Sequence, residues 1–400
     1  MPLFGPNIKK MEKNADIEGL IQAFKHENSR TRQEAVLALE RLGWKPQNDE
    51  DKAWVLAAKR NWQEVIALAE TAIPPLFVAM SHSHKAIAEE AGDALEKIAL
   101  SDPEKYLPIL CAAINNQLIE TSLGSKLDHA RSRTARILGK MRDGRAIPPL
   151  LKSAKKFHDL DYRQHKNELQ PAKTVTAKSD AYSILVKKVI QEIGPAAILT
   201  LSEMLDSKKE STRIEAINAL GSIHDERIFE ILVSTLQDKS VSIRNAGLTA
   251  ISQVNDKRVV EYLVEALRDT HYAVRKNACT QLIKRSWRPT NPEDKVYFAL
   301  AKLFQNMKRE GIQTVDWKAL RSVSRETVHP LIRSLHLEGD IFYTVQTYKA
   351  KKFVQEPARI WVIEMLVKNG KKTKPELIEA LQDPDPMIRQ GAEEALKRIR

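Results

Sequence analysis

Apolar residues recur along the middle of the chain with a period of 31 residues. The repeated positions are Leu201, Leu232 and Leu263; Leu205, Leu236 and Leu267; Ala216, Gly247 and Ala278; and Leu220, Ile251 and Leu282. Within a period, apolar residues lie one helical turn apart in two groups that a polar stretch separates, which indicates two amphipathic helices. A fixed period in this range is typical of repeat proteins, in which each unit buries its apolar face against its neighbours. We therefore expect an all-α, right-handed solenoid of about nine helix pairs.

Aspartate and arginine recur together in the turn between the two helices of a unit. The pairs, each six residues apart, are Asp238 and Arg244, Asp269 and Arg275, and Asp383 and Arg389. Together with the pattern Leu-x-x-x-Leu-x-Asp…Arg-x-x-Ala, they resemble the HEAT family, specifically the bacterial HEAT-like repeats also found in phycobilin lyase subunits. The resemblance implies a ladder of charge-assisted hydrogen bonds between adjacent units. It leaves the activity open, because HEAT arrays serve scaffolds, chaperone-like lyases and DNA-repair enzymes.

We expect one solenoid over residues 1–400, in four parts. These are N-terminal units with a Trp-Pro linker at 14–99, two units with insertions at 103–194, three regular units at 195–286, and a linker, degenerate units and a C-terminal unit at 287–400.

The linker occurs twice, with a constant offset of 243 residues. The matching residues include Leu39, Trp44, Pro46, Asn48, Glu50 and Asp51 in the first copy and Leu282, Trp287, Pro289, Asn291, Glu293 and Asp294 in the second. Proline ends the preceding helix, and a tryptophan fills the gap where stacking is interrupted. We expect Trp44, Pro46, Trp287 and Pro289 to act as wedges that change the curvature, in preference to a ligand-stacking role for the tryptophans.

Two consecutive units are longer than the rest, with insertions at 115–130 and 155–177 between their helices. Both insertions fall on the same edge of the array, where binding surfaces often lie. An interpretation of equal weight is that each extra length forms a longer first helix followed by a loop that binds no partner.

Further on, residues 336–354 lose the repeat pattern. The segment IFYTVQTY alternates like a strand, but its place after a matched helix favours a degenerate second helix.

The net charge of +12 is concentrated in two stretches. Residues 131–188 hold 15 basic and 5 acidic side chains, and residues 349–374 hold 8 and 2. The predicted binding residues in the first stretch, called here the basic patch, are Arg131, Arg133, Arg136, Lys140, Lys152, Lys155, Lys156, Arg163 and Lys166. Basic residues with aromatics between them suit phosphate backbones, and they suit an acidic protein equally. A solvated face without a partner also stays open.

Catalytic signatures are absent from the sequence. It contains no glycine-rich phosphate loop, HExxH, CxxC or GxSxG motif. His26 and Glu27 stand alone, whereas the HEAT-type iron hydroxylases carry paired His-Glu steps. For His82 and His84 a solvated turn is favoured over a metal site, because no further ligand follows at a suitable spacing. We expect no metal, no cofactor and no enzymatic activity.

The cellular location is expected to be cytoplasmic. No apolar run reaches the length of a membrane span, and Met1–Lys10 lacks a signal-peptide core. Cys111 and Cys279 are predicted to be packed thiols.

The sequence thus predicts a non-enzymatic scaffold that binds a protein, expected to be acidic, through its curved surface and the two insertions. The first alternative is nucleic-acid binding by the basic patch, as in DNA-glycosylase-like HEAT proteins, although no catalytic aspartate flanked by tryptophans is recognisable. The second is a phycobilin-lyase-like chaperone, which has only fold analogy behind it. The oligomeric state is left open.

Overall fold

The computed structural model describes residues 6–26, 28–82, 84–115, 128–165, 175–303, 325–337, 340–346 and 351–399. Within these ranges the structure describes the side chains of all residues except 157–180, 303, 325, 340–346, 351–358 and 361. The chain forms two compact units, Met1–Glu203 (unit 1) and Met204–Arg400 (unit 2).

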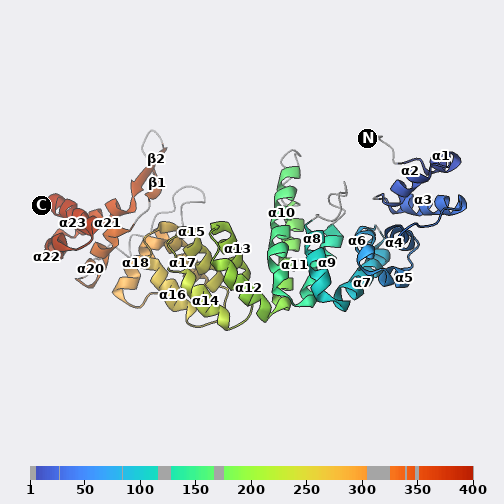
Figure 1. Ribbon diagram of the computed structural model, residues 1–400. Helices are drawn as coiled ribbons and strands as arrows, with labels where there is room; N and C mark the ends of the chain where they lie inside the picture. Colours follow the sequence, from blue (N-terminus) through green and yellow to red (C-terminus); the bar gives the residue numbers. More distant parts are fainter. Residues whose placement is uncertain are drawn as a thin grey trace. The chain divides into compact units, whose positions relative to one another are not determined.

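Unit 1 consists of helices (Figure 1). They are α1 (Ile8–Lys13), α2 (Ile17–Phe24), α3 (Ser29–Arg41), α4 (Asp49–Ala58), α5 (Trp62–Ala67), η1 (Ala69–Ala72), α6 (Ile73–Ala79), α7 (Lys85–Ser101), α8 (Pro103–Ile114), α9 (Asp128–Met141), η3 (Gly144–Ala146), α10 (Ile147–His165), α11 (Val175–Ile193) and α12 (Pro195–Leu205), within which the border between the units falls. First helices of unit 1 pack on their own second helices, as α6 does on α7, and successive second helices such as α7 and α9 pack side by side.

Unit 2 continues this architecture. Its elements are α13 (Glu210–Leu220), α14 (Arg227–Thr235), α15 (Val241–Ile251), α16 (Val259–Glu265), η4 (Ala266–Arg268), α17 (Tyr272–Lys284), α18 (Pro292–Leu303), α20 (Arg325–Arg333), η6 (Ser334–His336), β1 (Asp340–Gln346), β2 (Lys351–Pro357), α21 (Ala358–Lys368), α22 (Gly370–Glu379), η7 (Ala380–Gln382) and α23 (Pro386–Arg398). The second helices α13, α15 and α17 pack against one another in order. The fold is therefore the all-α solenoid of helix pairs that the 31-residue period predicted, and its handedness stays a prediction.

Most of the periodic apolar residues are buried in the core, whereas Leu205 and Leu236 are half-buried. Leu232 and Leu263 are fully buried on first helices, and Leu220 and Ile251 are fully buried on second helices. Gly247 lies where α15 approaches the end of α14, and a Cβ at this position would collide with the side chain of Thr235. The small residue at this point of the period is thus required by close helix packing.

The segment that was expected to be a degenerate helix is a β-hairpin. β1 and β2 pair antiparallel, with Asp340 opposite Pro357 and Gln346 opposite Lys351. The prediction of a helix over residues 336–354 is therefore wrong where the structure has β1 and β2, and residues 347–350 lie outside the described residues. The run of β-branched and aromatic residues in IFYTV favours a strand, and this preference outweighs the position in the repeat.

The second insertion is mostly helix. α10 runs to His165 and α11 begins at Val175, so the two helices take up most of residues 155–177. Figure 1 shows α10 extending past its neighbours α8 and α9. Most of the first insertion, residues 116–127, lies outside the described residues.

Candidate functional site

Arg244 links two consecutive units. Its Nε and Nη2 donate to the two carboxylate oxygens of Asp269 over 2.7 and 2.9 Å, and its Nη1 donates to the carbonyl of Asp238 at 3.0 Å. Both side chains of this ion pair are nearly buried, at 13% and 11% exposure. The hydrogen bonds to Asp269 raise the pKa of Arg244. Arg213 makes the preceding rung, to Asp238 at 2.8 Å.

The aspartates also hold their own turns. Asp238 accepts a hydrogen bond from the backbone N–H of Ser240 at 2.7 Å, and Asp383 accepts one from that of Asp385 at 2.9 Å. The arginines Arg275 and Arg389 donate to the carbonyls of Asp269 and Asp383, both over 2.7 Å, and Arg275 is fully buried. Each Asp-Arg pair thus closes a turn, and two of the arginines, Arg213 and Arg244, also bridge to the next unit.

A second set of ion pairs lies at the starts of the first helices. It was not predicted from the sequence. Asp256 and Arg258 pair at 2.8 Å, and Arg258 also reaches Glu230 of the preceding unit at 2.6 Å. Asp143 and Arg145 repeat this arrangement, with Glu104 at 2.7 Å. The signal in the sequence is Asp-x-Arg, which recurs with the 31-residue period at Asp225 and Asp256.

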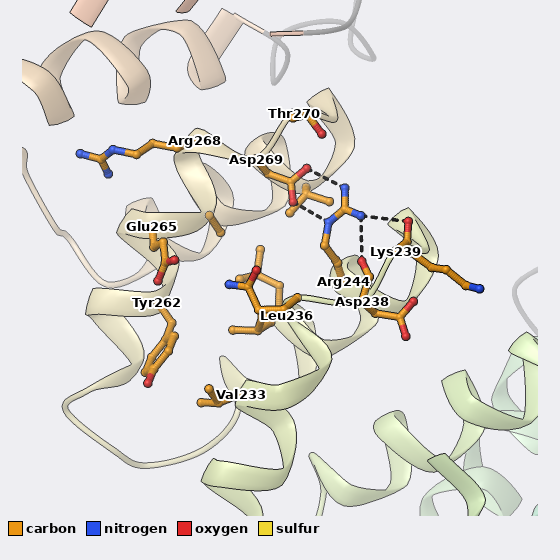
Figure 2. A pocket seen from close by; sticks show the side chains of 14 residues that line it. Val233, Leu236, Asp238, Lys239, Arg244, Tyr262, Glu265, Arg268, Asp269 and Thr270 are labelled. Atoms are coloured by element: carbon orange, nitrogen blue, oxygen red, sulfur yellow. Dashed lines mark hydrogen bonds and ion pairs between the residues drawn. The ribbon is translucent and has the colours of Figure 1, made fainter. Parts of the chain in front are cut away.

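A groove with a volume of about 550 Å³ lies between two of the regular units in unit 2. Its apolar lining comes from α14, α15, α16, η4 and α17 and consists of Val233, Leu236, Leu248, Tyr262, Ala266 and Val274. Its polar lining consists of Gln237, Asp238, Lys239, Arg244, Glu265, Arg268, Asp269 and Thr270. Figure 2 shows Leu236 between Glu265 and Lys239, with the side chain of Lys239 directed outward at the edge of the groove.

Most charges around this groove are already neutralised. Asp238, Arg244 and Asp269 belong to the ladder, and Arg268 pairs with Glu293 at 3.1 Å and with Asp294 at 2.7 Å. The remaining lining charges are the exposed side chains of Glu265 and Lys239, for which the described part of the chain supplies no ion-pair partner. The groove therefore combines an apolar floor with one available charge of each sign.

The structure places the first two members of the basic patch, Arg131 and Arg133, in ion pairs within the chain. Arg131 is buried, at 7% exposure, and donates to Asp128 at 3.2 Å, so it does not offer a surface charge. Arg133 pairs with Asp93 and, at 3.2 Å, with Glu96, both on α7. Asp93 and Glu96 belong to the neighbouring unit, about one repeat earlier in the chain. A count of charges along residues 131–188 therefore did not reveal these two partners.

The rest of the patch is divided. Lys140 pairs with Glu96 at 2.5 Å. The exposed members of the patch among the residues with described side chains are Arg136, Lys140, Lys152, Lys155 and Lys156. Arg163 lies in α10 with only its backbone described, and Lys166 lies outside the described residues.

The two linkers have matching geometry. The ring centroid of Trp44 lies 6.0 Å from that of Phe24, and Trp287 lies 5.4 Å from Phe298. Asn48 accepts from the backbone N–H of Asp51 at 2.8 Å, and the second copy repeats this bond between Asn291 and Asp294 at 2.7 Å. Pro46 is exposed and Pro289 half-buried. Both tryptophans pack on an aromatic ring of this chain.

Among the described residues, no three His, Cys, Asp or Glu side chains gather closely enough to hold a metal ion. No described helix has both the length and the apolar character needed to cross a bilayer.

Models of two repeat families match the sequence. Residues 196–284 match HEAT repeats, and residues 130–156 match the PBS lyase HEAT-like repeat. No curated protein matches the sequence significantly.

Several solved structures are similar to the chain. The crystal structure of a Kap121p mutant has 11% identity and a TM-score of 0.39, with 100% of this chain and 42% of the mutant chain covered. For Kap121p bound to Nup53p the identity is 13% and the TM-score 0.33, with the same shares covered. A structure of a microtubule polymerase with an array of TOG domains has 11% identity and a TM-score of 0.22, with 96% of this chain and 92% of that one covered. The chain spans less than half the length of Kap121p.

Proposed function

Because the chain is a HEAT-repeat protein, we propose that it is a non-enzymatic scaffold and that a protein partner docks in the groove of unit 2. Repeat arrays present extended surfaces to their partners, and each unit adds to that surface. The observation that carries the proposal is the groove itself, with apolar side chains between Glu265 and Lys239. A cytoplasmic location stays a prediction.

The lining defines the kind of partner. Leu236 and Val233 at the floor suit an apolar side chain, whose burial contributes about 1.5–3 kcal/mol. Glu265 suits a basic residue on one side of it, and Lys239 suits an acidic residue on the other. We therefore propose that the partner is a peptide segment in which an apolar residue stands between charges of opposite sign.

A peptide library displayed on phage and selected on the full chain tests this proposal. Glu265→Lys and Lys239→Glu should each weaken the selected peptides at least tenfold. The matched controls Glu261→Lys and Lys257→Glu change exposed residues outside the groove lining and should leave binding unchanged. The double variant with both groove charges exchanged should select peptides with the opposite charge order. Selected peptides that are insensitive to both groove variants would refute the proposal.

The exposed part of the basic patch supports a second candidate function, nucleic-acid binding. Arg136, Lys152 and Lys156 present positive charge on α9 and α10. Counterion release requires the logarithm of the affinity to fall linearly with the logarithm of the salt concentration, by about 0.9 per neutralised phosphate of duplex DNA. A gel shift with salt titration measures this slope, and a slope near zero dismisses the candidate. The insertions at 115–130 and 155–177 belong to the same proposed surface, on which an acidic protein is the competing partner.

The chaperone alternative depends on the match of residues 130–156 to the PBS lyase HEAT-like repeat. Absorbance spectra after incubation with a bilin test it.

A further inference from the structure

The start of α22 lacks the kind of ion pair that lies at the starts of other first helices. At the start of α16, for example, Asp256 and Arg258 pair at 2.8 Å. The corresponding segment Lys368–Lys374, called here the lysine turn, has the sequence KNGKKTK and contains no acidic residue. The lysine turn therefore has basic side chains without a counterpart of Asp256.

Neutral hydrogen bonds hold the lysine turn in place. The side-chain amide of Asn369 donates to the carbonyl of Met365 at 2.9 Å and closes the end of α21. The fully buried hydroxyl of Thr373 donates to the carbonyl of Leu366 at 2.8 Å and ties α22 to α21. The lysine side chains take no part in these two bonds, so the turn does not need them to close.

The four lysines of the turn form a cluster of exposed positive charge. Lys368, Lys371, Lys372 and Lys374 are all exposed, and within the described part of the chain none of them forms an ion pair. Lys371 and Lys374 lie three residues apart on α22, where like charges repel each other. Basic side chains in the first turn of a helix are also unfavourable because of the helix dipole. An anionic partner would relieve both kinds of repulsion.

Nearby acidic side chains do not balance this cluster. Glu376 and Glu379 lie further along α22, and neither forms an ion pair with another described residue. On α23 the glutamates of the last turns pair with Lys397 and Arg398 of the same helix, both at 2.6 Å. The positive charge of the lysine turn is therefore available to another molecule.

An exposed apolar side chain continues the same face of α22. Lys371, Lys374 and Ile378 follow one another at spacings of three and four residues, which places them on one face of the helix. Ile378 is 53% exposed. A nucleic-acid duplex would meet Ile378 with charged phosphates, whereas a peptide offers an apolar side chain beside its carboxylates. This face of α22 thus favours a peptide over a nucleic acid.

We propose that the lysine turn and Ile378 bind an acidic peptide segment of another protein, in which a run of carboxylates is followed by an apolar residue. The carboxylates pair with the lysines, and the apolar residue packs on Ile378. Lysines act as separate point charges on flexible stems, which suits several carboxylates of an extended segment. The site shares no residue with the groove of unit 2 or with the basic patch, and the proposal depends on neither.

The test uses the full chain with a fluorescent tetraglutamyl-leucine peptide and its tetraglutaminyl counterpart. The wild type should bind the acidic peptide and not the neutral one. The double variant Lys371→Glu, Lys374→Glu should weaken this binding at least tenfold and melt like the wild type, since neither lysine holds the turn. The double variant Lys208→Glu, Lys257→Glu reverses two exposed lysines elsewhere in unit 2 and is the matched control, which should bind as the wild type does.

A second comparison tests the apolar contact. Ile378→Ser should weaken the tetraglutamyl-leucine peptide severalfold and leave tetraglutamate without leucine unaffected. Leu199→Ser changes another leucine-sized exposed side chain and should have no effect on either peptide.

Three results would overturn the proposal. The first is a wild type that does not bind the acidic peptide, or that binds it no more tightly than the Lys371→Glu, Lys374→Glu variant does. The second is loss of peptide binding on reversal of the exposed basic patch residues Arg136, Lys152 and Lys156 alone. The third is tighter binding of duplex DNA than of the peptide, with the same dependence on Lys371 and Lys374, which would overturn the assignment of an acidic peptide.

Discussion

Arg268 donates from Nη2 to the carboxylate of Asp294 at 2.7 Å and so ties the last regular helix pair to the linker helix α18. Asp294 is buried, at 6% exposure, and also accepts the side chain of Asn291 at 2.6 Å. The first linker has Lys25 where the second has Arg268. Lys25 pairs with Glu50 at 2.7 Å, and among the described residues the carboxylate of the buried Asp51 accepts a hydrogen bond only from the side chain of Asn48. The two copies therefore share a cap but differ in the ion pair behind it.

This difference predicts unequal effects of the same substitution. Asp294→Ala leaves the guanidinium of Arg268 with fewer partners and should lower the local stability of α18 by about 1–3 kcal/mol. Asp51→Ala removes only the hydrogen bond that its carboxylate accepts from the side chain of Asn48, and should cost α4 about 1 kcal/mol. Amide hydrogen exchange in α18 and α4 measures each opening free energy separately. Equal losses in the two helices would contradict a role for the Arg268 ion pair.

The periodic leucines predict the mechanics of the array. Leu232→Ala and Leu263→Ala each remove a fully buried side chain and should lower the free energy of unfolding by about 2–5 kcal/mol. Leu199→Ala changes a leucine that is 65% exposed, and it should have little effect. Urea denaturation followed by circular dichroism gives the three values. A melting behaviour of Leu232→Ala like that of the wild type would refute the assignment of the inward face.

The close approach at Gly247 predicts a strongly coupled pair of substitutions. Gly247→Ala places a methyl group against the hydroxyl of Thr235, which itself donates to the carbonyl of Leu232 at 2.6 Å. Overpacking of this kind costs about 1–3 kcal/mol. Thr235→Ala removes the obstructing hydroxyl. The double variant should therefore lose less free energy of unfolding than the two single variants lose in sum. A double-mutant cycle by urea denaturation measures this coupling, and additive effects would rule out the steric cause.

The pKa of Asp225 predicts an acid-sensitive contact. Hydrogen bonds from the side chain and backbone N–H of Arg227 lower this pKa from its ordinary value of 3.8 to about 2. A carboxyl group with a lowered pKa stabilises the fold above its ordinary pKa, and this contribution is lost as the pH falls toward the folded value. Arg227→Ala should raise the pKa of Asp225 toward 3.8. A carboxyl carbon titration measures it, with Asp256 beside the intact Arg258 as the internal control, whose pKa should stay low.

The sequence predicted the parts of the fold that depend on one local rule. The period placed Leu232 and Leu263 in the core, because stacking imposes the same burial on every unit. It did not predict the partners of Arg133, because Asp93 lies 40 residues earlier on a helix of the previous unit. Glu89, Asp93 and Glu96 share one face of α7 at spacings of four and three residues, and this acidic stripe was the signal that could have been found.

The basic patch predicts two kinds of variant with opposite outcomes. Arg136, Lys152 and Lys156 are exposed, so reversing all three to glutamate should change the free energy of unfolding by no more than about 0.5 kcal/mol each. Arg133 has a side chain that is only 15% exposed and that pairs with Asp93 and Glu96. Arg133→Glu places a carboxylate among these acids and should lower the stability by about 1–3 kcal/mol.

Thermal melting and a gel shift with a short single-stranded DNA separate structural from binding roles. The triple variant should melt like the wild type and lose any DNA retention. Arg133→Glu should melt earlier, and Arg133→Gln should fall between it and the wild type, since it removes the ion pair without adding a like charge. If Arg133→Glu melts like the wild type, the ion pairs of Arg133 with α7 do not stabilise the array. Arg133 would then be counted with Arg136 as a candidate binding residue.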